Sequence, residues 1–174
     1  MVSLPIDPVA RPALIVAIGP PGCGKSTVAA AWQGRSIDQP LIDPRPADRR
    51  IVSTDVIRGR LFGDPAVQGA WTGIWSEVVQ EWQAAIADQV AAVFYDATNI
   101  DRSIRRPVIT TARSVGFAWL EAWWFDVPLA TCQARNQARD RHVPDAIIDR
   151  MWHQLADRPP HLAEGFDRCH RLRS

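Results

Sequence analysis

The sequence predicts an α/β fold of three layers, in which helices cover both faces of a mostly parallel sheet. Three observations support this class. Short apolar runs of strand length alternate with longer segments of helical periodicity. A glycine-rich segment joins the first apolar run to the first helical segment. Aspartates closely follow three of the other apolar runs, and because parallel strands end at one edge of a sheet, we expect these carboxylates to share the rim where ligands bind.

The first element is a continuous apolar run at 14–18, which is typical of a buried strand. It leads into a segment that matches the phosphate-binding pattern G-x-x-x-x-G-K-[ST]. The segment consists of Gly19, Pro20, Pro21, Gly22, Cys23, Gly24, Lys25, Ser26 and Thr27. A helix at 26–33 follows, and Gly34 can end it. Strand, glycine loop and helix are the arrangement that such a loop requires, so the sequence predicts the P-loop NTPase fold.

The composition of this loop suits a nucleotide. Gly22 and Gly24 allow backbone angles that turn successive N–H groups toward an anion, and the helix N-terminus adds positive partial charge. Lys25 is the only lysine among twenty basic residues, and its compact ammonium can reach the β- and γ-phosphates of ATP. Ser26 is expected to bind Mg²⁺. Cys23 fits as a small residue in a tight turn. The alternatives are a chain-wide arginine bias and a glycine-rich turn without a ligand.

The other strands are expected at 50–53, 91–95, 119–125 and 166–172. The prolines in 38–50 predict an irregular surface loop there. Helices are expected at 55–61, 74–90, 101–115, 128–138 and 145–155. Asp101 can cap the third of these, while Pro107 predicts either a kink in it or a later start. Pro128 and Pro144 are placed to begin the last two.

The whole chain is ordinary in composition and is expected to form one domain over 1–174, with an N-terminal extension at 1–12. The net charge of +1 gives no strong field that would draw the protein to nucleic acid or membrane. Three cysteines without a CxxC pair argue against a disulfide framework or a zinc site and favour the reducing cytoplasm. The chain shows no signal peptide and no apolar run long enough to span a membrane, and no obligate protein partner is evident.

Phosphoryl transfer to a hydroxyl also needs a group that orients or deprotonates the acceptor and a cation that spreads charge. Asp55 is the candidate base, and Arg58 lies on the same helix face at i+3. Together they could hold an acceptor hydroxyl or phosphate, or they could be an ordinary surface pair. Asp96 follows a buried strand and could hold a metal-bound water or fix the acceptor. Its alternative is a turn or helix cap.

A basic run between two helices, at about 134–145, is the candidate lid over the nucleotide. It holds Arg135, Arg139 and Arg141, one of which could stabilise charge during transfer. The alternative is a solvated helix face.

Four elements together resemble the kinase domain of polynucleotide 5′-hydroxyl kinases and, more broadly, the AAA-type P-loop kinases of bacteria. They are the phosphate loop at 19–27, Ser53-Thr54-Asp55-x-x-Arg58, Tyr95-Asp96-Ala97-Thr98-Asn99, and Arg135-Asn136-x-x-Arg139 with Val143-Pro144. The resemblance covers nearly the whole chain, 13–166. The phosphate loop is shared by many families, whereas the other three elements together are much more specific.

The resemblance implies the following roles. Lys25 and Ser26 would bind the phosphates of ATP and Mg²⁺, and Asp55 would be the general base toward the acceptor hydroxyl. Arg58 would contact the acceptor's phosphate, Asp96 would support the acceptor site, and Arg139 would stabilise the transition state. The chain departs from the family in the residues 140–142 of the lid, in the proline-rich 38–50 segment and in lacking the end-healing modules that often accompany such kinases.

The acceptor is therefore open between a nucleic-acid 5′-hydroxyl, ranked first, and a small molecule such as a nucleoside, sugar or metabolite. A nucleotide-binding regulatory protein with little turnover is a third reading. Eight tryptophans invite base stacking, but most are expected in the core, with Trp71 and Trp152 as the less certain cases. Two arginine clusters could hold a phosphodiester backbone, but they are expected to form ordinary exposed faces. They are Arg102-Arg105-Arg106 and Arg45-Arg49-Arg50.

Overall fold

The structure is a computed structural model that describes residues 12–34, 49–67, 69–139 and 142–173 of the 174-residue chain. Almost all of the expected N-terminal extension, most of the proline-rich segment and the lid residue Arg141 lie outside the described residues.

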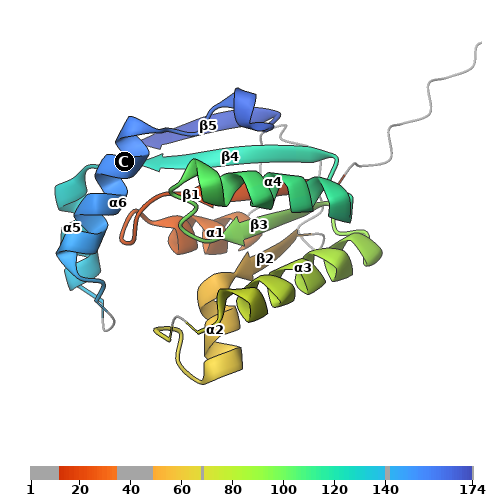
Figure 1. The fold of residues 1–174 in the computed structure, drawn as a ribbon, viewed down its shortest axis with the longest axis horizontal. Helices are drawn as coiled ribbons and strands as arrows, with labels where there is room; N and C mark the ends of the chain where they lie inside the picture. Colours follow the sequence, from red (N-terminus) through yellow and green to blue (C-terminus); the bar gives the residue numbers. More distant parts are fainter. Residues whose placement is uncertain (1–11, 35–48, 68, 140–141, 174) are drawn as a thin grey trace, which may run out of the picture.

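Five strands form one sheet in which every neighbouring pair is parallel. The strands are β1 (Ala13–Ile18), β2 (Arg49–Ser53), β3 (Ala92–Asp96), β4 (Trp119–Asp126) and β5 (Arg168–Arg173). Their order is β2-β3-β1-β4-β5, so the strand that precedes the phosphate loop is central (Figure 1). The predicted strands are confirmed to within two residues at every end, and the largest difference is in the last strand, which begins at Arg168 rather than 166.

The helices are α1 (Lys25–Gly34), α2 (Thr54–Phe62), α3 (Trp71–Ala87), α4 (Arg102–Val115), α5 (Leu129–Gln137) and α6 (Asp145–Asp157), with a 3₁₀ turn at Leu162–Glu164. Figure 1 shows α3 and α4 on one face of the sheet and α1 on the other. The helices α2, α5 and α6 lie at the carboxyl ends of the strands (Figure 1). The predicted three-layer α/β class is thus confirmed.

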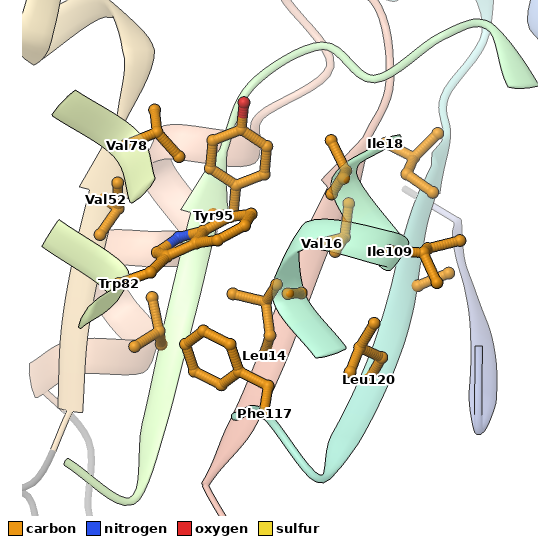
Figure 2. Packing of buried hydrophobic residues seen from close by; sticks show 14 of the residues in the cluster. Leu14, Val16, Ile18, Val52, Val78, Trp82, Tyr95, Ile109, Phe117 and Leu120 are labelled. Atoms are coloured by element: carbon orange, nitrogen blue, oxygen red, sulfur yellow. The ribbon is translucent and has the colours of Figure 1, made fainter. Parts of the chain in front are cut away.

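The core has two parts because the side chains of β1 alternate between the faces of the sheet. On the α3–α4 face, Leu14, Val16 and Ile18 pack with Trp82 and Phe117 (Figure 2). The opposite face buries Ala13, Ile15, Ala17, Ala29 and Trp32. Because both faces of the sheet are buried at β1, the side chains on both sides of this strand are apolar, which explains its unbroken apolar sequence.

Of the two alternatives at Pro107, a kink or a later start, the later start is wrong, because α4 already begins at Arg102. Asp101 is the N-cap, as predicted, and its side chain accepts a hydrogen bond of 2.7 Å from the backbone N–H of Ser103. Pro107 removes one backbone donor from the helix interior. The buried Val108 and Ala112 hold the helix against the sheet despite this loss.

Two arginines expected on exposed faces are buried. Arg105 is fully buried and forms an ion pair of 2.8 Å with Glu164, which is also buried. Arg49 donates to the backbone oxygen of Trp32 at 2.6 Å and lies over the Trp32 ring. Their charges are tolerated because specific partners surround them. Arg102 and Arg106 are exposed as expected, whereas Arg45 lies outside the described residues.

Each helix in the described part of the chain is too short or too polar to cross a membrane.

Candidate active site

The phosphate loop leaves β1 at Gly19, whose N–H donates to the backbone oxygen of Thr98 at 3.0 Å. Gly22 and Gly24 have φ angles of 80° and 100°, a region that other residues rarely adopt. A Cβ atom at Gly22 would lie 2.1 Å from the backbone oxygen of Cys132 in α5. Glycine is therefore required there both by the turn and by the close approach of α5.

Lys25, the first residue of α1, folds back over this loop. Its ammonium donates to the backbone oxygens of Gly19 and Pro20, each at 2.9 Å, and lies 3.6 Å from the Cys23 sulfur. The side chain is largely buried, yet it lines the cavity described below. The positively charged ammonium therefore lies inside the loop.

Ser26 and Asp96 meet at the end of the sheet. Asp96 is the last residue of β3 and is buried, and its Oδ2 accepts a hydrogen bond of 2.7 Å from the Ser26 hydroxyl. A hydroxyl beside a carboxylate is an oxygen donor set that suits Mg²⁺ in nucleotide sites. These two residues therefore fit the metal that the P-loop fold implies.

Asp55 and Arg58 form an ion pair of 2.7 Å within α2. The strand register pairs Ser53 with Asp96, and this brings the first turn of α2 beside the end of β3. The Asp55 side chain is 60% exposed, whereas that of Arg58 is 14% exposed. The surface-pair alternative is thus right about the pairing, but both side chains also line the same cavity as Lys25.

Arg135 and Arg139, the two arginines of the predicted lid that lie in the described residues, differ in position. Arg135 lies beside the loop, since its Nη1 is 3.8 Å from the position of a Cβ atom on Gly24. Arg139 follows α5 and lines the cavity. The amide of the buried Asn136 bonds both the N–H and the oxygen of Val143, at 3.0 and 2.8 Å. This pairing holds Val143 against the end of α5.

A main cavity of about 830 Å³ unites these groups. Its polar part contains Lys25, Ser26, Asp55, Arg58, Asp96 and Arg139, all of which were predicted as site residues. Sequence reasoning missed its apolar part. That part is lined by Trp71, Trp75, Ile104, Pro107, Val108, Val143, Ile147 and Met151, from α3, α4 and the region of α6. The sequence signal for this apolar wall was Trp71, which was set apart above from the tryptophans expected in the core.

Asn99 is a further residue whose role was missed. Its φ angle of 48° is rare outside glycine, although asparagine tolerates it better than most residues, and its side-chain amide donates to the backbone oxygen of Ala17 at 2.9 Å. It therefore holds the loop after β3 against the end of β1.

Two groups near the site stay neutral at ordinary pH. Burial raises the pKa of the Cys132 thiol to about 11, and the neighbouring Cys23 acts in the same direction. Burial also raises the pKa of Tyr95, whose hydroxyl points toward the end of β1 that carries Ile18 (Figure 2). Neither group adds a negative charge near the phosphate loop.

A family model for the AAA domain matches residues 14–158. The chain belongs to this AAA domain family. No match was found among the curated proteins.

Solved structures share the fold. The chain is similar to one in the Pnkp1/Rnl/Hen1 RNA repair complex, with 21% identity and a TM-score of 0.64 over 84% of this chain and 45% of that one. It is also similar to a protein from Chloroflexus aurantiacus, with 14% identity and a TM-score of 0.65 over 94% and 85%. A sugar kinase from Janibacter sp. HTCC2649 gives 17% identity and a TM-score of 0.53 over 94% and 84%. The chain thus spans less than half of the RNA repair protein that it matches.

Proposed function

We propose that this protein is an ATP-dependent phosphotransferase that moves the γ-phosphate of ATP to a hydroxyl acceptor. The observation that carries the proposal is a single cavity that joins Lys25 and the Ser26–Asp96 pair to the Asp55–Arg58 pair. The first three residues suit a nucleotide with its metal. The last two offer a base and a cation to a second substrate. A phosphotransferase needs both halves side by side.

On the nucleotide side, the backbone N–H groups of 19–27 would surround the phosphates of ATP. Lys25 would exchange its contacts with Gly19 and Pro20 for phosphate oxygens, and Arg135 would flank the bound nucleotide. Ser26 would bind Mg²⁺, with Asp96 acting through a metal-bound water. The metal would neutralise charge that develops on the phosphates.

On the acceptor side, Asp55 would orient the hydroxyl and accept its proton as the new O–P bond forms. Arg58 would hold a phosphate of the acceptor, since a guanidinium suits planar, bidentate recognition of oxyanions. Arg139 would stabilise charge on the transferring group from the lid at about 134–145.

A polynucleotide 5′-hydroxyl is the acceptor ranked first. It is supported by the cavity position of Arg58 and by the likeness in fold to the RNA repair protein. The second candidate is a small molecule, which the apolar cavity wall and the net charge of +1 favour. A regulatory protein with little turnover is less consistent with a cavity that holds a base beside the phosphate loop. We place the activity in the cytoplasm because Cys23, Cys132 and Cys169 are free.

The test is transfer of radiolabelled γ-phosphate from ATP with Mg²⁺. The full chain and its Lys25→Ala variant are offered 5′-hydroxyl DNA and RNA oligonucleotides and, separately, a mixture of small metabolites. We expect the wild type to label an oligonucleotide and the variant to label nothing. Labelling of a metabolite alone would favour the small-molecule candidate. Absence of labelling in every arm would contradict the phosphotransferase proposal.

A further inference from the structure

An aromatic column runs from the core to the main cavity. It consists of Tyr95 on β3 and of Trp82, Trp75 and Trp71 on α3. The ring centroids are 5.2 Å apart between Tyr95 and Trp82, and 5.5 Å apart between Trp82 and Trp75, both pairs being edge-to-face. Trp75 and Trp71 are 6.1 Å apart and nearly parallel, with 23° between their planes. The column thus changes from core packing to a stack as it reaches the cavity.

Exposure rises along the same column. Trp82 is fully buried and packs in the core (Figure 2), whereas Trp75 is half-buried and Trp71 is 47% exposed. Trp71 and Trp75 both line the main cavity. An exposed indole that stacks on a neighbouring ring offers a large planar surface to a planar partner.

Ion pairs join the helix that carries the tryptophans of the column to the helix that carries Asp55 and Arg58. Arg60 of α2 bonds Glu77 and Glu81 of α3, each at 2.8 Å. Asp55 and Arg58 lie on the same α2, so the two ion pairs tie the base and the cation to the helix that carries Trp71. The Asp55–Arg58 pair and Trp71 therefore lie on two helices that ion pairs join, and all three side chains line the same cavity.

We propose that Trp71, backed by Trp75, is the stacking platform for a nucleobase of the acceptor. This inference rests on the proposed function and narrows its acceptor to a nucleoside or nucleotide end, with the hydroxyl at Asp55 and the adjoining phosphate at Arg58. A base is favoured over a plain sugar by the exposed indole face, because stacking on an aromatic ring stabilises a bound base. Ile104 and Pro107 add apolar surface to the same cavity.

The first experiment compares two 5′-hydroxyl oligonucleotides that are identical except that one lacks the 5′-terminal base. Adenosine 3′-monophosphate serves as the free-nucleotide acceptor. We expect the wild type to prefer the intact end, and Trp71→Leu to lower kcat/KM for the intact end by roughly 5- to 150-fold, the range of one stacked base. Transfer to the abasic end should hardly change, and Trp71→Phe should keep the preference because it keeps a ring. Trp124→Leu, outside the cavity, is the matched control.

A second experiment needs no turnover. Without ATP, adenosine 3′-monophosphate should quench tryptophan fluorescence of the wild type, and most of that quenching should be absent in Trp71→Phe.

The first experiment also identifies the source of the base. Labelling of the oligonucleotide but not of the mononucleotide would identify a nucleic-acid end as that source, and the reverse would identify a free nucleotide.

Equal transfer to intact and abasic ends would overturn the platform and leave the phosphotransferase proposal standing. If no acceptor is labelled, the proposed function fails, and the quenching then decides the platform by itself. Identical quenching in the wild type and in Trp71→Phe would overturn it.

Discussion

The Ser26 hydroxyl donates a hydrogen bond of 2.7 Å to Oδ2 of Asp96, although the two residues are 70 positions apart. The contact joins the helix that follows the phosphate loop to the end of β3. It also explains how a buried carboxylate is accommodated: the hydroxyl satisfies one oxygen, and the cavity is open to the side chain.

This relationship predicts the effect of Asp96→Asn. The amide keeps the volume but removes the negative charge, so we expect Mg²⁺-dependent transfer to fall by roughly 100-fold or more. Binding of ATP in the absence of Mg²⁺ should change little. Rates measured over a series of Mg²⁺ concentrations, with thermal melting as the check on folding, test this expectation. A variant with the wild-type rate and metal dependence would remove Asp96 from the site.

Asp55→Asn should keep nucleotide binding and lose most transfer, by roughly 100- to 10,000-fold, because an amide cannot accept the acceptor's proton. Asp88→Asn is the matched control. Asp88 also pairs with an arginine at 2.7 Å and is also 60% exposed, but it does not line the main cavity. Single-turnover rates and nucleotide titrations of both variants separate chemistry from binding. If the two variants behave alike, Asp55 belongs to an ordinary surface pair.

Substitution of Arg139 and of Arg135 should change different kinetic constants. Arg139→Ala is expected to lower kcat by roughly 1,000-fold or more if this side chain stabilises the transferring phosphoryl group. Arg135→Ala should mainly raise the KM for ATP, because Arg135 lies beside the phosphate loop. Steady-state kinetics of both variants decide the assignment. An unchanged kcat in Arg139→Ala would transfer the role to Arg135 or Arg141.

The phosphate loop and the elements around it were predictable because their signals are local. Lys25 and Ser26 follow from a pattern of nearby residues. The strand ends just before Asp55 and at Asp96 follow from apolar runs that stop. Parallel strands then bring these distant positions to one rim, as the register of Ser53 with Asp96 illustrates.

The residues that were missed depend on partners far away in the sequence. Arg105 sits in a run of charges that is typical of a solvated face, whereas its burial depends on an ion pair with Glu164, 59 positions later, and on backbone oxygens that include that of Arg158. Trp71 and Trp82 lie on one helix and have the same residue type. The packing of α2, α3 and α4 decides that one is in the core and the other at a cavity, and no local pattern carries that information.

The buried ion pair gives a stability prediction. Arg105 uses its guanidinium on both oxygens of Glu164 and on the backbone oxygen of Arg158. Arg105→Met should lower the free energy of unfolding by about 3–5 kcal/mol, because the Glu164 carboxylate is then left buried without its partner. Arg106→Met, at the exposed neighbouring position, should change it by less than about 0.5 kcal/mol. Urea unfolding of both variants measures the difference, and equal midpoints would contradict the role of the pair.

The cap of α4 predicts a pH-dependent contribution to stability. Hydrogen bonds with Ser103, and a further one from Gln154, lower the pKa of Asp101 from its usual 3.8. A lowered folded pKa means that the carboxylate stabilises the fold above about pH 4, and that this contribution is lost as the pH falls through the folded value. Asp101→Ala should therefore lower the free energy of unfolding by about 1 kcal/mol at pH 7, and by less at pH 3. Denaturant unfolding of both proteins at the two pH values tests the sign, since a difference that grows toward low pH would mean that the charged form does not act as the cap.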